Sequence, residues 1–237
     1  MIPYQKKSLS SSKTDALRGM LTVPGDKSIS HRSLIMGSMA IGESTVSGLL
    51  EGEDVLGTAM ALKALGSDIY KDENDLWHIH GVGIGGLRQP IHSLDMGNSG
   101  TGARLLMGLV STHPLSVTFT GDKSLTSRPM KRVTSPLSNF GAEFHGNTEG
   151  TLPITVKGAQ MPMPFTYELP VASAQVKSAI MLGALNTPGR TTVIEKIPTR
   201  DHTERMFKYF NVPIEITDNT DQGLAIHVTG YAELKAK

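Results

Sequence analysis

The sequence predicts an α/β domain built from three copies of one unit, and three observations indicate it. First, helical segments starting at Ser28, Ser99 and Ser173 each begin with small polar residues and turn apolar at i, i+3, i+4 spacing. Second, each has a methionine eight residues after its serine and a basic residue four or five after it. Third, two β-rich runs close each unit. α/β chains in general look partly self-similar, but the matched spacing favours a true β-α-β-α-β-β repeat.

The first unit is expected over about residues 21–85, after a Ser- and Lys-rich leader at residues 1–20 that leads into its first strand. The first helix is "SISHRSLIMGSMA", and the β-rich run "STVSGLL" follows it. The second helix, "EDVLGTAMALKALG", stops at Gly66, because glycine readily adopts the left-handed conformation of a helix C-terminus. The strands "SDIYKD" and "LWHIHG" close the unit.

The second and third units are expected over about residues 92–158 and 165–230. Their first helices are "SGTGARLLMGLVS" and "SAQVKSAIMLGAL", followed by the strands "LSVTFTG" and "TTVIEK". Their second helices, "RPMKRVTSPLSNFG" and "DHTERMFKYFN", stop at Gly141 and Asn211. The closing strands are "AEFHGN" with "LPITVKG" and "VPIEIT" with "LAIHVTG".

Composition excludes several classes of protein. A formal net charge of +1 argues against a broad nucleic-acid-binding surface, which needs clustered excess Lys and Arg. The chain has no cysteine, so it has no disulfide, zinc-thiolate site or thiol nucleophile, which fits a reducing compartment. No apolar run reaches the roughly 18 residues of a membrane span. It also lacks an HExxH motif, an EF-hand loop and a Walker loop, so no metal site is expected.

The repeat predicts an anion site. If three equivalent units pack around a pseudo-threefold axis, their first helices lie parallel and their N-termini converge. Each N-terminus offers unpaired backbone N–H groups and a partial positive charge, and together they form an anion receptor. Lys27 and Arg32 lie at the start of the first unit's first helix, and Arg128 and Arg200 lie in loops just before the second helices of the second and third units. Arginine binds phosphate or carboxylate bidentately, so a ligand set with several negative charges is expected.

Other polar residues have structural interpretations. Arg104 and Lys177 lie one turn inside their helices, where an anion or a structural Asp or Glu partner fits equally well. His31 is interpreted as a capping or packing residue rather than a catalytic one. The group Asp201, His202 and Glu204 is more typical of a helix start than of a metal site. Five further side chains are assigned to the surface: Lys123, Lys131, His78, His80 and His227.

These stretches resemble the 5-enolpyruvylshikimate-3-phosphate (EPSP) synthase family. The matching segments are "PGDKSISHRSL", "LDMGNSGTGARLLMGL", "GDKSLTSRPM", "ASAQVKSA" and "TRDHTE", spread from residue 23 to about residue 205. The details look more like the glyphosate-tolerant bacterial class than the enteric type. The resemblance implies one domain of a two-domain inside-out α/β barrel, namely the N-terminal half. Residues 21–232 would be the substrate-binding domain, residues 1–20 would belong to the absent second domain, and residues 233–237 would be a truncated crossover.

The resemblance also implies site residues. Those expected to hold shikimate-3-phosphate are Ser28, Arg32, Ser173, Ala174, Gln175 and Arg200. Those expected at phosphoenolpyruvate are Lys27, Asn98, Gly100, Thr101 and Arg128, with Lys27 and Arg128 as catalytic groups. Gln175 would touch both substrates. Gly100, having no side chain, would leave room for the inhibitor glyphosate.

The implied reaction transfers the enolpyruvyl group to the 5-hydroxyl of shikimate-3-phosphate in the cytoplasm, with no metal or organic cofactor. The family's acid–base groups come largely from the absent C-terminal domain, so this chain alone is expected to be inactive. One alternative is an isolated anion-binding domain without turnover. Another is half of a UDP-N-acetylglucosamine enolpyruvyl transferase, but that class typically has Lys-Asn where this chain has Lys27-Ser28, and most members use a loop cysteine.

Overall fold

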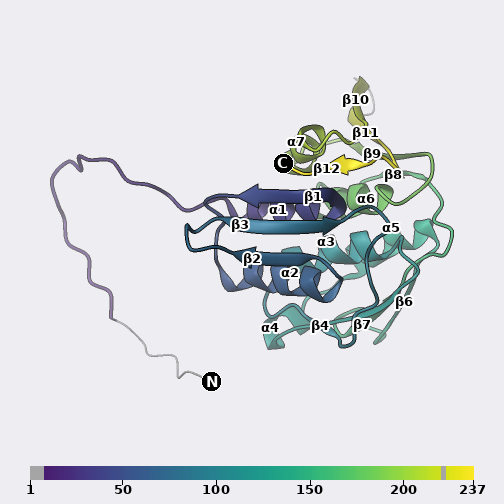
Figure 1. Cartoon of the computed structure of the whole chain (residues 1–237), viewed down its shortest axis with the longest axis horizontal. Coiled ribbons are helices and arrows are strands. Elements are labelled where there is room, and N and C mark those ends of the chain that lie inside the picture. The colour runs from purple at the N-terminus through teal and green to yellow at the C-terminus, as the bar shows by residue number, and fades with distance from the viewer. Residues whose placement is uncertain (1–7, 220–222) are drawn as a thin grey trace.

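The computed structural model describes residues 8–219 and 223–237 (Figure 1). Residues 8–26 contain no helix or strand, and Figure 1 shows them extending away from the rest of the chain. The apolar side chains of this segment, such as Leu17 and Met20, are almost fully exposed. The first unit then consists of α1 (Lys27–Met39), β1 (Ala40–Val46), α2 (Glu53–Ala64), β2 (Asp68–Lys71) and β3 (Trp77–Val82).

The second and third units follow the same plan. The second has β4 (Leu94–Asp95), α3 (Gly100–Val110), β5 (Ser116–Thr120), α4 (Lys123–Thr126), α5 (Lys131–Leu137), a 3-10 turn (Ser138–Phe140), β6 (Glu143–Gly146) and β7 (Ile154–Lys157). The third has β8 (Thr166–Glu168), α6 (Ala174–Ala184), β9 (Arg190–Glu195), α7 (His202–Tyr209), β10 (Ile214–Asn219) and β11 (Gly223–Thr229), and β12 (Leu234–Lys235) follows. The short helix α4 has no counterpart in the sequence-based prediction.

The predicted helix stops are confirmed. Gly66 and Gly141 adopt φ values of +114° and +96°, and Asn211 adopts +62°. These are left-handed conformations, which glycine and asparagine tolerate best. Each residue therefore ends the second helical segment of its unit and turns the chain into the closing pair of strands.

Three four-stranded sheets share one topology. Their strand orders are β12-β1-β3-β2, β4-β5-β7-β6 and β8-β9-β11-β10. In each sheet the first pair is parallel and the other pairs are antiparallel. The repeat is therefore present in the pairing of strands as well as in the order of elements.

The first unit departs from the expected order at its opening strand. None lies between the leader and α1 within residues 8–26, so that prediction is wrong for this unit. Its place is taken by β12, where Ala40 pairs with Leu234 and Ile41 with Lys235. Residues that the sequence assigns to a crossover thus complete the first sheet. In Figure 1 the C-terminus lies beside β1 for this reason.

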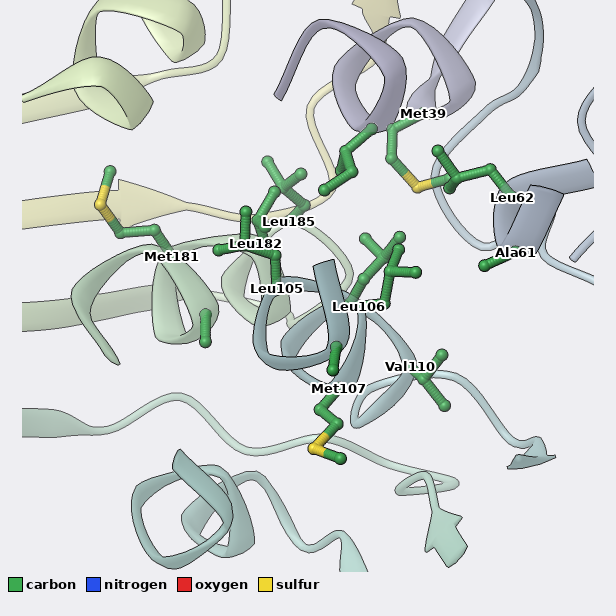
Figure 2. Packing of buried hydrophobic residues seen from close by; sticks show 14 of the residues in the cluster. Met39, Ala61, Leu62, Leu105, Leu106, Met107, Val110, Met181, Leu182 and Leu185 are labelled. Atoms are coloured by element: carbon green, nitrogen blue, oxygen red, sulfur yellow. The ribbon is translucent and has the colours of Figure 1, made fainter. Parts of the chain in front are cut away.

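The first helices of the three units form the centre of the core. Met36, Met107 and Met181, the methionines of the repeat, are all buried. Figure 2 shows α3 between α6 on one side and α1 with α2 on the other. The helices α3 and α6 approach closely at Gly108, where an added Cβ would lie 2.2 Å from the Ala179 carbonyl oxygen. The sheets pack against these helices, which fixes the helix starts relative to one another.

Within the described residues, no helix is both long and apolar enough to cross a membrane.

Candidate anion-binding site

The starts of α1, α3 and α6 are built alike. The N-cap residues are Asp26, Ser99 and Ser173, and each side chain accepts a hydrogen bond from the backbone N–H three residues later. None of the three helices has an acidic residue in its first turn. The positive ends of α3 and α6 are therefore not balanced by a carboxylate at the helix start, whereas α1 has the Asp26 carboxylate at its N-cap.

The three helix starts meet at one pocket, as the repeat predicts. Its walls come from α1, α3, α6 and the start of α7, and its lining residues are Ser28, Arg32, Thr101, Ala174, Gln175, Arg200 and His202. Six of these are predicted site residues, and His202 is an addition. The pocket is small in this structure, with a cavity volume of about 40 Å³.

Arg32 is the buried cation of this pocket. Its side chain reaches from α1 to two other elements, donating from Nε to Thr203 Oγ1 on α7 at 2.6 Å and from Nη2 to Ser178 Oγ on α6 at 2.6 Å. Its Nη1 donates to the Ser28 carbonyl oxygen at 3.0 Å. These acceptors are neutral, and no carboxylate of the described residues lies within ion-pair distance of Arg32. A buried guanidinium without a paired anion is costly, so the site is suited to an anionic ligand.

The electrostatics of Arg32 agree with this geometry. Burial lowers the pKa of Arg32 to about 10, the Glu204 carboxylate opposes that shift, and the positive charge of Arg200 adds to it. Two like charges thus face the same pocket, with the backbone N–H groups of the helix starts beside them. An anion between them would relieve their repulsion.

Gln175 connects α6 to the start of α3. Its Nε2 donates to Thr101 Oγ1 at 3.0 Å, and its Oε1 accepts from Arg104 Nη1 at 3.2 Å. Arg104 also donates to the Gly100 carbonyl oxygen and has no carboxylate partner among the described residues. The structural Asp or Glu interpretation of Arg104 is therefore wrong within the described chain. Burial lowers its pKa, and Arg128 and Arg132 lower it further.

A second group of predicted residues lies at the start of α3, outside the lining of the pocket. Arg128 Nη2 donates to Asn98 Oδ1 at 2.6 Å and to Ser124 Oγ at 3.1 Å. A Cβ added to Gly100 would lie 3.1 Å from Arg128 Nη1 and 2.9 Å from Arg104 Nη1. Asn98, Gly100, Arg104 and Arg128 therefore form a second cationic cluster, which Gln175 links to the pocket.

Lys27 does not line the pocket, and it pairs with a residue that the sequence patterns did not single out. Its Nζ is 2.8 Å from Asp54 Oδ2 on α2. Burial raises the pKa of Asp54, but the hydrogen bond and charge of Lys27, together with His31, outweigh it and hold that pKa below its usual value. Helix α2 carries Asp54 in its first turn, where a carboxylate also complements the helix dipole. An acidic residue is common at this helix position for that reason alone, so the sequence does not mark Asp54 as the partner of Lys27.

His31 is a packing residue, as predicted. It is fully buried, its Nδ1 lies 2.8 Å from Thr58 Oγ1, and its Nε2 has no hydrogen-bond partner. Burial lowers its pKa to about 4, against the opposing effect of the Asp54 charge. The ring is therefore neutral near pH 7.

Contacts decide two further interpretations, those of Lys177 and His78. Lys177 has the structural partners Glu195 and Glu204, both buried. His78 is less exposed than predicted, because it contacts Glu43 and stacks on Tyr70 with ring centroids 4.8 Å apart. The described residues contain no cluster of His, Asp and Glu that could hold a metal ion.

Ser173 lines a different and larger cavity of about 390 Å³, between α5 and the segment before α6. Its walls include the apolar side chains of Leu169, Val171 and Val176. We place the candidate site in the smaller pocket, because three helix starts and two arginines converge only there among the described cavities. Ser173 does not line the smaller pocket. It contributes there only by capping α6, whose first residues, Ala174 and Gln175, line the pocket.

The fold and the site define a class of protein: a three-unit α/β domain with a cationic pocket, suited to phosphate or carboxylate groups, at its converging helix starts. The family model for EPSP synthase (3-phosphoshikimate 1-carboxyvinyltransferase) matches residues 11–237. The chain therefore belongs to the EPSP synthase family, which confirms the resemblance seen in the sequence.

Relatives and solved structures agree with this assignment. A 3-phosphoshikimate 1-carboxyvinyltransferase from Novosphingobium aromaticivorans is 58% identical over 219 residues, which are 92% of this chain and 50% of that protein. One from Parvibaculum lavamentivorans is 55% identical, over 98% of this chain and 51% of its own length. The EPSP synthase structure from Acinetobacter baumannii has a TM-score of 0.86 and 44% identity, covering 92% of this chain and 48% of its own. The chain thus spans about half the length of the relatives it matches.

Proposed function

We propose that this chain supplies one half of an active site that transfers the enolpyruvyl group of phosphoenolpyruvate to the 5-hydroxyl of shikimate-3-phosphate. The observation that carries the proposal is Arg32, which is buried, has no ion-pair partner among the described residues, and faces the pocket together with Arg200. The family assignment supports the identity of the substrates.

The pocket is proposed to hold the phosphate and ring of shikimate-3-phosphate. Arg32 and Arg200 supply charge, and Ser28 and Ala174 let the ligand approach the backbone at two helix starts. Gln175 contacts Thr101 on α3, so it is placed between this pocket and the second cationic cluster. Ser173 contributes by capping α6 rather than by lining the pocket.

The second cationic cluster is proposed to hold phosphoenolpyruvate. Arg128 is oriented there by Asn98 and Ser124, and Arg104 lies on the other side of Gly100. Lys27 is placed as a further cation, with Asp54 keeping its ammonium group oriented. Glyphosate, as a compound that would compete for the same cations, is proposed to bind beside Gly100.

The reaction requires several anionic groups in one place. The 5-hydroxyl group gives up its proton as its oxygen attacks C2 of phosphoenolpyruvate, and a proton adds to C3. The tetrahedral intermediate then loses a proton from C3 and expels inorganic phosphate, which leaves the enol ether. Two unit charges 4 Å apart repel by about 4 kcal/mol at an effective dielectric constant of 20. Two phosphates and a carboxylate multiply that repulsion. The cations and helix starts offset it, and no metal or organic cofactor enters the proposal.

We further propose that the acid–base groups come from the part of the enzyme that the matched relatives have and this chain does not span. Leu9, Leu17 and Met20 of residues 8–20, whose apolar side chains are exposed in this chain, are proposed to pack against that other part. The partner is the complementary half of the same enzyme. The completed protein is proposed to act in the cytoplasm, and this chain alone is proposed to be inactive.

Release of inorganic phosphate from both substrates tests the proposal. The chain should show no turnover alone and should gain it when the second half of a relative is added. Arg128→Ala should abolish the complemented activity while the circular dichroism spectrum stays unchanged, whereas Lys157→Ala, a change at an exposed lysine on β7, should retain it. Turnover by the chain alone would contradict the assignment of acid–base groups to the other half. No activity after complementation would overturn the transferase proposal.

The second candidate is an anion-binding domain without turnover. Arg32 and the helix starts would serve that role equally well, since binding needs no acid–base group. Binding of shikimate-3-phosphate without complemented turnover would favour it. The family match favours EPSP synthase over the UDP-N-acetylglucosamine alternative.

A further inference from the structure

A cluster of charged side chains is buried behind the pocket, between α6, β9 and α7. Lys177 on α6 is fully buried, and its Nζ lies 2.9 Å from Glu195 Oε1 on β9 and 2.5 Å from Glu204 Oε1 on α7. Burying such charges costs much of the energy that their attraction returns, so ion pairs at this depth contribute little to stability over apolar packing. Stability alone therefore does not account for these buried charges.

Glu195 holds the segment that leads to Arg200. Its Oε2 accepts hydrogen bonds from Thr199 Oγ1 at 2.8 Å and from the Thr199 backbone N–H at 3.3 Å. Arg200 directly follows Thr199 and lines the pocket. The Glu195 carboxylate thus links Lys177 to Thr199, the residue next to Arg200.

Glu204 fixes the other end of the same segment. The residue before it, Thr203, accepts the 2.6 Å hydrogen bond from Arg32 Nε and contacts Ser178 Oγ at 2.7 Å. Residues 199–204 carry both Arg200 and His202 to the pocket wall. One buried lysine therefore ties both ends of this segment to α6, the helix whose start forms the opposite wall.

Lys177, Glu195 and Glu204 together carry one net negative charge. Arg32 lies beyond ion-pair distance of Glu204 but is still influenced by that carboxylate. Burial lowers the pKa of Arg32, and the nearby Glu204 carboxylate opposes that shift, so the two groups interact. Without Lys177, Glu204 would be left with Arg32 as its nearest cation of the cluster and would compete with an incoming phosphate.

We propose that Lys177 is a positioning residue: by holding Glu195 and Glu204, it keeps residues 199–204 and the Arg32 guanidinium in the arrangement that receives phosphate. The identity of the ligand rests on the proposed function, but the positioning itself rests on the contacts above. Lys177 lies behind the pocket wall and does not line the pocket.

Three variants separate positioning from simple stability. Thr199→Val removes one hydrogen bond and leaves every buried charge in place, and Thr118→Val, which removes a hydroxyl contact on β5, is its matched control. Lys177→Met removes the central charge at similar length. Lys177→Met with Glu204→Gln removes the surplus negative charge as well. Two readouts are used on the whole chain: calorimetric binding of shikimate-3-phosphate, and hydrogen exchange of the Arg32 Nε–H by NMR, assigned through its absence in Arg32→Lys.

Thr199→Val should weaken binding by roughly threefold to tenfold. This is less than the tenfold or more expected for losing a hydrogen bond between ligand and a charged group, because the lost bond positions Arg200 and does not touch the ligand. Lys177→Met should weaken it more, and adding Glu204→Gln should restore part of the loss. Exchange of the Arg32 Nε–H should accelerate in Thr199→Val and not in Thr118→Val. Removing the surplus carboxylate can also recover stability, so affinities are compared under conditions where circular dichroism shows every variant to be folded. If Lys177 only adds stability, the affinity of the folded variants should not change.

The two proposals fail in different ways. Absence of binding by the unmodified chain and by the complemented enzyme would overturn the proposed function, and the exchange of Arg32 Nε–H would still decide the positioning role. Unchanged exchange and unchanged affinity in Thr199→Val, together with no recovery in the double variant, would overturn the positioning role while leaving the proposed function intact.

Discussion

Arg32 Nε on α1 donates a 2.6 Å hydrogen bond to Thr203 Oγ1 on α7, although the two residues are 171 positions apart in the chain. This contact joins the first unit of the repeat to the third. Together with the hydrogen bond from Arg32 Nη2 to Ser178 Oγ on α6, it fixes the orientation of the planar guanidinium group at the pocket. Such two-point orientation is available to arginine and not to lysine.

Arg32→Lys should therefore weaken the binding of shikimate-3-phosphate even though it keeps the charge. Loss of one charge-assisted hydrogen bond of about 1.5–3 kcal/mol corresponds to roughly tenfold or more in Kd. Isothermal titration calorimetry on the complemented enzyme measures it. Arg190→Lys is the matched control, because Arg190 is half exposed and pairs with Glu215 at the far end of β9. Equal affinity in both variants would show that Arg32 acts as a point charge only.

Acid should destabilise the domain through His31. Burial lowers the folded-state pKa of His31 from 6.5 to about 4. Between these two pH values the unfolded chain binds a proton that the folded chain does not, so stability falls as the pH is lowered from about 6.5 towards 4. A shift of this size corresponds to at most about 3 kcal/mol. Burial also lowers the pKa of His113, which acts in the same direction.

Urea unfolding at a series of pH values between 4 and 7 measures this effect. His31→Gln keeps a polar group near Thr58 but cannot titrate, so its stability should vary less over that interval. His145→Gln is the control, since His145 is exposed on β6. If the unmodified chain and His31→Gln lost stability equally on acidification, the neutral buried state of His31 would be refuted.

Gly100→Ala should fold normally and alter the second cationic cluster. Gly100 has no positive φ that alanine would strain, but the added methyl would lie 2.9 Å from Arg104 Nη1 and 3.1 Å from Arg128 Nη1. Both are ends of flexible side chains, so they can move by a few tenths of an ångström. We expect glyphosate to inhibit the complemented variant less strongly, and phosphoenolpyruvate to bind more weakly.

The measurement is the glyphosate concentration for half inhibition beside the KM for phosphoenolpyruvate. Gly57→Ala on α2 is the control, because an added Cβ there meets only the Met96 carbonyl oxygen, at 3.8 Å. Unaltered inhibition in Gly100→Ala would remove the steric basis for placing glyphosate beside this residue.

Local patterns predicted most of the helices and the meeting of their starts. Gly66, Gly141 and Asn211 mark helix ends by their own backbone preferences, and the repeat alone places Ser28 and Ala174 near each other. Contacts between residues of different units leave no such local pattern in the sequence. Thr203 accepts a hydrogen bond from Arg32 only because α7 packs on α1. Nothing in the segment "DHTERMFKYFN" distinguishes that threonine from one on the surface.

The sequence likewise did not reveal which residues pair with the charged side chains. Asp54 appears in the sequence as an acidic residue of a helix first turn, which is common for dipole reasons alone. Its pairing with Lys27 depends on how α2 lies against α1. Lys177 and Arg104 occupy similar places in two copies of the repeat, yet one pairs with carboxylates and the other with Gln175. Only tertiary packing separates those outcomes.

The parallel pairing of β12 with β1 leads to the last prediction. Leu234 is buried and lies opposite Ala40, and backbone hydrogen bonds from Thr45 to Lys237 and from Ala236 to Ile41 continue the contact. Leu234→Ala should lower the free energy of unfolding by about 2–4 kcal/mol, as for other buried leucines. Amide exchange at Thr45 should accelerate with it. Leu21→Ala, at a side chain that is 82% exposed, should change neither quantity. Equal urea midpoints for Leu234→Ala, Leu21→Ala and the unmodified chain would mean that residues 234–235 do not hold the first sheet together, and that the first unit is stable with three strands.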